Sequence, residues 1–205
     1  MKLMAIIGSP RKGGNTELLV DRVIEGFRST GDVAVEKCRI VDKKIEHCTG
    51  CMTCVFPSPG TGRCMIEDDM GELLECMKAS DAFIFGSPNH MRTITAPLLN
   101  FLTRMLPLLV LRVHYDEQGN RVGGEMSSKI QGKTAAMVVS QGEPFFCSSL
   151  VYEVLENNLN DFRLQRVGNI ISMGNAEKGE VANKRDDLKK AFDLGVHLGT
   201  VTGQT

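Results

Sequence analysis

The chain has 205 residues, and its 24 Lys and Arg residues against 25 Asp and Glu residues give a formal net charge of −1. A charge this close to zero, with basic residues scattered along the chain, argues against a nucleic acid as the main partner. Its apolar runs are shorter than the roughly 18 residues that span a bilayer, and the N-terminal run is too short for a signal peptide. We therefore expect a single cytoplasmic domain over 1–205, since about 150 residues per domain is usual.

Apolar runs and helical periodicities alternate along the chain. In chain order, the pattern predicts a strand over 2–8, a helix over 15–29, a strand over 33–41, a helix over 69–79, a strand over 81–87, a helix over 95–107, a strand over 133–141, a helix over 148–160, a strand over 164–173 and a helix over 186–199. This alternation predicts an α/β fold, a five-stranded parallel sheet with helices on both faces. The flavodoxin-like strand order 2-1-3-4-5 is one common arrangement of such a sheet.

Two segments fall outside this alternation, and two local patterns add detail to it. The segment 42–68, which is rich in Cys, Gly and Pro, is predicted to be an irregular loop, and 108–132 is predicted to be a polar insertion. A connection of that length often has a function. The residues Asp69–Glu72 have the D-x-x-E form of a capping box. On the last helix, Gly195 and Gly199 share the apolar stripe and predict a close approach to the sheet.

The segment GSPRKGGNT, residues 8–16, joins the first predicted strand to the first predicted helix. Free backbone N–H groups and the helix dipole at such a junction attract a phosphate, and glycine allows the backbone to approach it closely. The spacing fits neither a Walker A loop nor the G-x-G-x-x-G of a dinucleotide-binding fold. A glycine-rich turn capped by Asn15, without a ligand, is the alternative. The candidate phosphate-binding residues are Ser9, Arg11, Lys12, Gly14, Asn15 and Thr16.

The pattern G-S-P-R-x-x-G-N-T after an N-terminal strand resembles the NADPH-dependent FMN reductase family of flavodoxin-like proteins, most closely its iron–sulfur flavoprotein branch. The resemblance runs through most of the chain, and it implies that Ser9, Arg11, Asn15 and Thr16 hold the phosphate of FMN. It also implies that the loop after the third strand flanks the isoalloxazine ring, through Pro88, Asn89, His90, Met91, Arg92 and Thr93. Many relatives have an aromatic residue at the position of His90. Because ligands of open α/β sheets lie beyond the carboxyl ends of the strands, Gln141 and Gly142 are expected to form a third loop of the site.

Four of the seven cysteines, Cys48, Cys51, Cys54 and Cys64, have the spacing C-x2-C-x2-C-x9-C. Three thiolates at two-residue gaps can surround a small inorganic core, and C-x2-C-x2-C is a known feature of [4Fe–4S] sites. Cys64 is then the local candidate for the fourth ligand. The resemblance to iron–sulfur flavoproteins favours the same interpretation. A zinc site, a redox-active thiol pair and unligated cysteines are the alternatives.

The remaining cysteines and a pair of carboxylates have structural explanations. Cys38 and Cys76 fall in a predicted strand and a predicted helix, so they are expected to be small core residues. Cys147 lies near the expected flavin edge and is expected to be buried. The pair Asp68 and Asp69 precedes a helix, so capping explains it better than acid–base chemistry. No catalytic role is therefore assigned to any side chain.

The leading hypothesis is an FMN-dependent oxidoreductase that passes electrons between NAD(P)H or ferredoxin and an acceptor, through a [4Fe–4S] cluster. The flavin would perform the chemistry while the protein positions the ring and tunes its potential. One alternative is a flavodoxin-like electron carrier, which the near-neutral charge disfavours because carriers are usually acidic. Another is a zinc or redox-sensing module on the same fold. The long insertion and the cysteine loop, together with the dimers and tetramers of relatives, predict a homodimer or homotetramer.

Overall fold

The computed structural model of the chain describes residues 1–55, 63–146 and 149–204. Its centre is a five-stranded parallel sheet in the order β2-β1-β3-β6-β7. These strands are β1 (Lys2–Ile7), β2 (Ala34–Arg39), β3 (Ala82–Pro88), β6 (Thr134–Ser140) and β7 (Gln165–Ser172). Since β6 and β7 are the fourth and fifth strands of this sheet in chain order, the predicted order 2-1-3-4-5 is confirmed.

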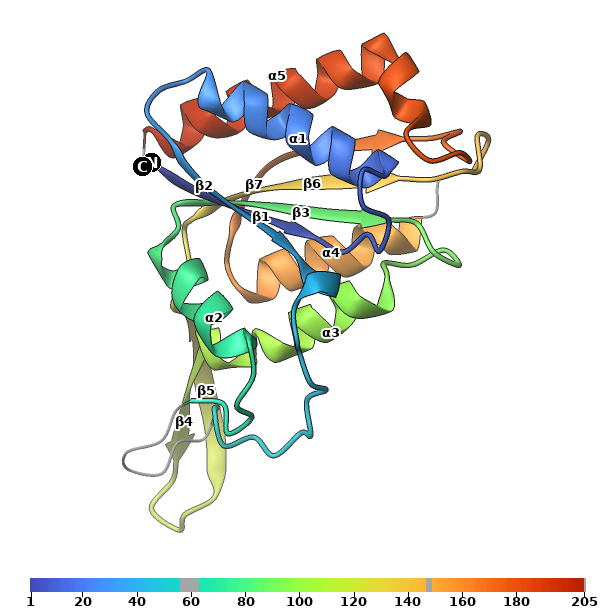
Figure 1. The fold of residues 1–205 in the computed structure, drawn as a ribbon. Helices are drawn as coiled ribbons and strands as arrows, with labels where there is room; N and C mark the ends of the chain where they lie inside the picture. The colour runs from blue at the N-terminus through green and yellow to red at the C-terminus, as the bar shows by residue number, and fades with distance from the viewer. Residues whose placement is uncertain (56–62, 147–148, 205) are drawn as a thin grey trace.

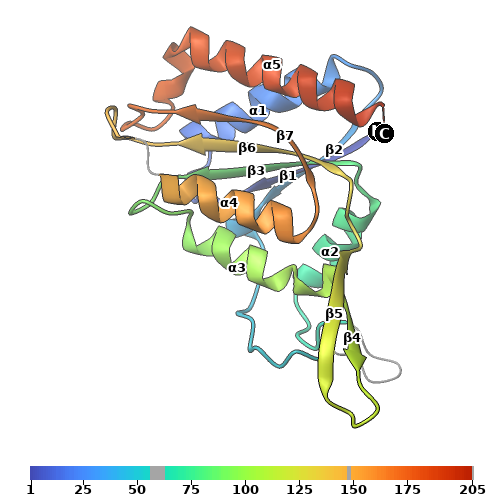
Figure 2. The same ribbon diagram turned by 180° about the vertical axis from the view of Figure 1, so that it is seen from behind.

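Helices cover both faces of the sheet and give three layers (Figures 1 and 2). One face carries α1 (Asn15–Arg28) and α5 (Arg185–Thr202), and the other carries α2 (Met70–Ala79), α3 (Ala96–Arg104) and α4 (Ser149–Asp161). In the connections that the structure describes lie three short 3-10 helices, η1 (Ile40–Asp42), η2 (Leu106–Leu108) and η3 (Glu180–Asn183). In the described part of the chain, no helix combines the length and the apolar composition that crossing a bilayer requires.

Alternating side chains of the central strands form two hydrophobic cores. Along β1, Met4 and Ile6 pack into the core on the side of α2, α3 and α4, whereas Leu3, Ala5 and Ile7 pack into the core beneath α1 and α5. Strands β1, β3 and β6 are buried along nearly their whole length. Central parallel strands are covered on both faces, which is why the sequence shows them as continuous apolar runs.

The last helix packs closely against the first helix. A Cβ atom on Gly195 would lie 1.9 Å from the carbonyl oxygen of Val23, and one on Gly199 would lie 2.2 Å from Thr30 Oγ1. On α1, a Cβ atom on Gly26 would lie 2.0 Å from the carbonyl oxygen of Phe192. Gly195 and Gly199 therefore serve the contact of α5 with α1, and for these two residues the prediction of contact with the sheet was wrong.

Helix α2 begins where the sequence predicts, but the capping-box prediction was wrong. Asp69, at the N-cap position, has helical backbone angles (φ −62°, ψ −15°), and its side chain makes no capping hydrogen bond. An N-cap residue normally has extended angles that aim its side chain at the first turn. The Asp69 carboxylate instead accepts the N–H of Lys44 at 2.8 Å. Asp68 provides the expected cap, because it accepts the N–H of Met70 at 3.0 Å.

The insertion 108–132 contains a β-hairpin that the sequence analysis did not predict. Strand β4 (Leu109–Tyr115) pairs antiparallel with β5 (Arg121–Ser128), and the two-stranded sheet projects from the helical layer that contains α2 and α3 (Figures 1 and 2). The carboxylate of Asp116 accepts backbone N–H groups across the connecting turn. The Gly123-Gly124 pair hides β5 in the sequence, because glycine is depleted in strands.

Candidate functional site

The connection between β1 and α1 is locked against its neighbours at the carboxyl edge of the sheet. Gly8 donates its N–H to the carbonyl of Gly86 at 2.8 Å, and its own carbonyl accepts the hydroxyl of Thr95 at 2.8 Å. A Cβ atom on Gly8 would lie 2.7 Å from Leu98 Cβ. Glycine is therefore required where the phosphate loop leaves the strand.

The loop then closes on the first turn of α1 through Glu17. Gly13 has a left-handed φ of 64°, and its N–H donates to Glu17 Oε2 at 2.7 Å. Lys37 Nζ and Arg39 Nη1 lie 2.8 and 3.7 Å from the carboxylate. Burial would raise the pKa of Glu17, but the hydrogen bonds and charges of these partners outweigh it and lower the pKa. The carboxylate is thus ionised and neutralised, and the unpaired N–H groups in the first turn of α1 can attract an anion.

The side chain of Asn15 joins the phosphate loop to the connection between β7 and α5. Its Nδ2 donates to the carbonyls of Asn175 and Glu177 at 3.1 and 2.7 Å. Its Oδ1 accepts the N–H of Val181 at 3.1 Å. Because these contacts use the amide at both ends, the part of Asn15 suited to a phosphate is its backbone N–H.

A cavity of about 210 Å³ lies at this edge, beyond the carboxyl ends of the strands. Nine predicted residues line it, namely Ser9, Arg11, Asn15, Thr16, Pro88, Asn89, His90, Gln141 and Gly142. Four lining residues were not predicted, namely Pro10, Ser140, Asn175 and Ala176. The predicted residues outside its lining are Lys12, Gly14, Met91, Arg92 and Thr93. A larger cavity of about 540 Å³ lies beside Cys64 and α2, away from the sheet edge where ligands of such folds bind.

Two hydroxyls in the lining of this cavity are paired with each other, and two amide oxygens of lining residues have no hydrogen-bond partner among the described residues. Thr16 Oγ1 and Ser140 Oγ are hydrogen-bonded at 2.7 Å. Asn89 Nδ2 donates to Gln141 Oε1 at 3.1 Å. Among the described residues, Oδ1 of Asn89 and Oδ1 of Asn175 are buried without a hydrogen-bond partner. Buried polar atoms are nearly always paired, so the cavity offers two acceptors to donors on a ligand.

The loop after β3 contains a strained turn. His90 and Thr93 exchange backbone hydrogen bonds of 2.9 and 3.0 Å, and Met91 and Arg92 between them have left-handed φ values of 50° and 67°. Such angles cost a residue other than glycine at least about 1 kcal/mol. The side chain of Met91 is 96% exposed. Strain of this kind concentrates at ligand sites, and here it adjoins the cavity.

The sequence analysis missed the loop after β7, although it carried a usable signal. Strand β7 ends at Ser172, so its connection must begin at the same edge as the other three. Gly174, with a φ of 66°, turns the chain. Asn175 Nδ2 then donates to Ser172 Oγ at 2.8 Å, and Ser172 donates to Asp187 Oδ2 at 2.6 Å. A Gly-Asn pair directly after a predicted core strand could have marked this fourth wall.

The cysteine loop lies elsewhere: it leaves the carboxyl end of β2 through η1 and runs below α3 (Figure 1). Cys48 and Cys51 are exposed, and Cys54 and Cys64 are partly buried. Among the described residues, no three His, Cys, Asp or Glu side chains are gathered to hold a metal ion. Burial raises the pKa of Cys54, and the charges of Cys64, Cys51 and Cys48 raise it further.

Two of the other three cysteines are placed as the sequence predicts. Cys38 is buried, and burial raises the pKa of its thiol to about 11. Cys76 is partly buried and packs against the core beneath α2. Cys147 and the part of the cysteine loop over 56–62 lie outside the described residues. The described thiols outside the cysteine loop are therefore packing residues.

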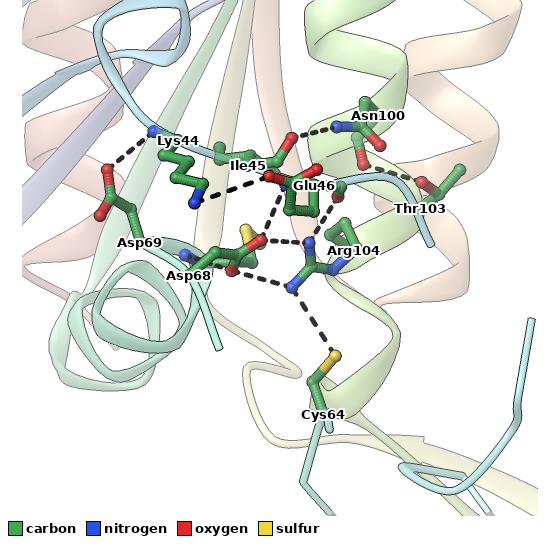
Figure 3. Close-up of polar contacts among 10 residues, drawn as sticks. Lys44, Ile45, Glu46, Cys64, Asp68, Asp69, Asn100, Thr103 and Arg104 are labelled. Atoms are coloured by element: carbon green, nitrogen blue, oxygen red, sulfur yellow. Dashed lines mark hydrogen bonds and ion pairs between the residues drawn. The ribbon is translucent and has the colours of Figure 1, made fainter. Parts of the chain in front are cut away.

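A buried ion pair holds the two ends of the cysteine loop together (Figure 3). Arg104, which is 2% exposed, donates from Nη1 and Nη2 to the two carboxylate oxygens of Asp68 at 2.6 and 2.9 Å. Its Nη1 also donates to the carbonyl of Glu46, and its Nη2 lies 3.7 Å from Cys64 Sγ. Burial would raise the pKa of Asp68, but the hydrogen bonds from Arg104, Glu46 and Met70 outweigh it and lower the pKa. Asp68 therefore has a second function besides capping.

Comparison with known proteins identifies the family. The sequence profile of the family described as NADPH-dependent FMN reductase matches residues 1–176. The chain belongs to the NADPH-dependent FMN reductase family. An iron–sulfur flavoprotein of Archaeoglobus fulgidus is 34% identical over 198 residues, which are 95% of this chain and 77% of that protein. An iron–sulfur flavoprotein of Methanosarcina thermophila is 31% identical over 127 residues, which are 62% of each chain.

Solved structures share the fold of this FMN reductase family member. An NAD(P)H:quinone oxidoreductase from Methanothermobacter marburgensis has a TM-score of 0.72 at 16% identity, covering 97% of this chain and 98% of that one. An FMN-dependent NADH-azoreductase from Bacillus anthracis, in complex with FMN, has a TM-score of 0.71 at 11% identity, covering 97% and 100%. With the family match, they support an FMN-dependent oxidoreductase on a flavodoxin-like fold.

The cavity fits the cofactor that the family implies. A helix N-terminus with Arg11 beside it suits a phosphate. The unpaired oxygens of Asn89 and Asn175 suit hydroxyl or ring N–H donors, both of which FMN carries. The position at the edge between β1 and β3 is the switch point at which strand order reverses, where such sheets bind their ligands.

Proposed function

We propose that this FMN-dependent oxidoreductase binds FMN in the cavity at the carboxyl edge and holds a [4Fe–4S] cluster in its cysteine loop. The proposed cluster ligands are Cys48, Cys51, Cys54 and Cys64. The observation that best supports the flavin site is that Asn89 and Asn175, which line one cavity beside a helix N-terminus, each have a buried amide oxygen without a hydrogen-bond partner among the described residues. Bound FMN accepts two electrons together and can release them singly.

The described residues suggest how each part of FMN is held. The first turn of α1 offers N–H groups to the phosphate, and Arg11 and Lys12 add positive charge. The paired hydroxyls of Thr16 and Ser140, two residues that line the cavity, can turn toward phosphate oxygens. The ring would lie between the loop 88–93 and Gln141–Gly142. Asn89 is fixed there by Gln141, whose own amide donates to the carbonyls of Glu143 and Phe146.

The cluster proposal depends on donor chemistry and on the relatives. Four cysteine thiols in one loop, spaced C-x2-C-x2-C-x9-C, are the donor set that a [4Fe–4S] cluster requires. The relatives from Archaeoglobus fulgidus and Methanosarcina thermophila are named iron–sulfur flavoproteins. We infer that this chain holds both cofactors in the cytoplasm and exchanges electrons with NAD(P)H or ferredoxin.

The hairpin supports self-association as a homodimer or homotetramer. Tyr115, Val122 and Met126 are exposed on β4 and β5. A lone two-stranded sheet is marginally stable in water and gains stability when another surface covers it. The cysteine loop runs below α3 (Figure 1), whereas the lining of the FMN cavity includes none of its residues. A second copy could therefore bring its cysteine loop near this flavin.

An anaerobic visible spectrum with FMN, iron and acid-labile sulfide measured per chain tests the proposal. We expect flavin bands with a broad iron–sulfur shoulder, about one FMN and about four iron atoms per chain. Colourless protein that takes up no FMN would contradict the flavin site. Zinc without iron or sulfide would favour the zinc module instead. Steady-state oxidation of NADPH with an artificial acceptor separates an oxidoreductase from a carrier.

A matched pair of variants tests the flavin site directly. Asn89→Ala removes an unpaired acceptor from the cavity wall, and one lost hydrogen bond of about 1.4 kcal/mol weakens FMN binding by about tenfold. Asn157→Ala, on the exposed face of α4, is the control and should leave the FMN dissociation constant unchanged. Equal affinities in the two variants would show that the flavin does not contact Asn89.

A further inference from the structure

We propose that Arg104 is a positioning residue that sets the reduction potential of the cluster through its hydrogen bond to Cys64. The inference rests on the proposed function, because it requires Cys64 to be a cluster ligand. It concerns a side chain on helix α3 that the sequence analysis did not assign to any site. Figure 3 shows its guanidinium between the two ends of the cysteine loop.

The buried charge of Arg104 needs compensating partners. Arg104 is 2% exposed and carries a cation into the protein interior, which is unfavourable unless partners compensate it. Asp68 supplies a carboxylate whose side chain is fully buried. That carboxylate also accepts the N–H groups of Glu46 and Met70 at 2.8 and 3.0 Å. The pair is thus fixed by backbone groups from both ends of the cysteine loop.

Asp68 does not accept hydrogen bonds from all the N–H donors of the Arg104 guanidinium. Nη2 lies 3.7 Å from Cys64 Sγ, which is hydrogen-bond distance for the larger sulfur atom. Nε is buried and makes no hydrogen bond among the described residues. The guanidinium therefore has donors to spare toward Cys64. A hydrogen bond from a cation is stronger than one from a neutral donor.

Arg104 would affect electron transfer through its charge. A cluster held by Cys64 would gain one negative charge on taking one electron from the reduced flavin, with no bond made or broken. Hydrogen bonds to the sulfurs and nearby net charge are among the factors that set a cluster's potential. Arg104 stabilises the added charge and so raises the potential. Asp68, the partner carboxylate, has the opposite effect on it.

Opposite effects of the two partners are the basis of the test. The purified holoprotein is titrated anaerobically, with the cluster followed by electron paramagnetic resonance and the flavin by absorbance. Arg104→Gln should make reduction of the cluster at least tenfold less favourable, a fall of about 59 mV for one electron. Asp68→Asn should shift the potential upward. If the Arg104–Asp68 ion pair had a merely structural role, the two substitutions would leave the cluster potential unchanged, or would lower the cluster content of both variants alike.

Two further variants control for charge and for folding. Lys44→Gln removes an exposed positive charge from the same loop, where Lys44 Nζ lies 3.9 Å from Glu46 Oε1. This substitution should change the equilibrium constant for reduction of the cluster by less than twofold. Arg104→Lys keeps the buried charge and should recover most of the shift. If Arg104→Gln retains no cluster, the upward shift of Asp68→Asn and the recovery in Arg104→Lys decide the question.

The outcomes separate this inference from the proposed function. A wild-type protein with FMN and no cluster signal refutes the proposed cluster, and the role of Arg104 with it. A wild-type cluster whose potential is unchanged in Arg104→Gln and Asp68→Asn, or is shifted the same way in both, refutes the role of Arg104 alone. The flavin potential should be the same in every variant.

Discussion

Asn15→Ala should destabilise the protein before any cofactor binds. The substitution removes three hydrogen bonds, to the carbonyls of Asn175 and Glu177 and to the N–H of Val181, at 3.1, 2.7 and 3.1 Å. At about 1 kcal/mol for each bond, the free energy of unfolding should fall by about 3 kcal/mol. For a chain of this length, the midpoint of thermal denaturation should drop by roughly 6–12 °C.

The assay is denaturation of the FMN-free protein, followed by circular dichroism, with FMN affinity measured in parallel. Asn158→Ala is the matched control, because Asn158 makes a single side-chain hydrogen bond, to the carbonyl of Val154 at 2.7 Å. Its cost should stay near 1 kcal/mol. If Asn15→Ala left the FMN-free protein as stable as this control and lost FMN affinity alone, the amide would be a phosphate donor. The hydrogen bonds described for it would then be wrong.

Three further predictions concern a backbone angle, a steric contact and two lowered pKa values. Met91→Asn should raise the stability by about 1 kcal/mol in a denaturant titration, since asparagine tolerates the left-handed φ of this exposed position; a loss would show that the angle is not strained. Gly8→Ala should cost about 1–3 kcal/mol and weaken FMN binding, because its Cβ would lie 2.7 Å from Leu98 Cβ; unchanged calorimetric stability and affinity would contradict this. The lowered pKa values of Glu17 and Asp68, below 4.5 and 3.8, predict stability that is complete above those values and lost as pH falls through the folded-state pKa values. Thermal midpoints should therefore fall on acidification, and Glu17→Gln should flatten that fall.

The fold was predictable because its signals are local. Strands β1, β3 and β6 are covered on both faces and therefore appear in the sequence as unbroken apolar runs. The phosphate loop was found for a similar reason, since its glycines and polar residues lie in one stretch between a strand and a helix. The order of the strands and the helix layers on both faces of the sheet then follow from the rules that govern parallel sheets.

The roles of particular side chains were less predictable, because their partners are distant in the chain. Asn15 resembles a phosphate donor, yet its partners lie more than 150 residues away. Asp68 resembles a helix cap, and its pairing with Arg104, 36 residues later, has no sequence signature. Nothing in Met91 itself indicates a left-handed backbone. Tertiary contacts decided each of these positions.

The two proposed cofactor sites are held by different kinds of structure. The FMN cavity lies where four connections leave a rigid sheet, and Gly8 and Asn15 fasten its phosphate loop to β3, α3 and the β7–α5 connection. Among the described residues, the cysteine loop is fastened near its ends, by Asp68, Asp69 and the side chains of α3. Loss of Arg104 should therefore loosen the cysteine loop and leave the FMN cavity intact. Because the hydrogen bonds described for the two sites use different residues of α3 and its N-cap, the FMN content of Arg104 variants is an internal measure of folding against which any loss of iron can be judged.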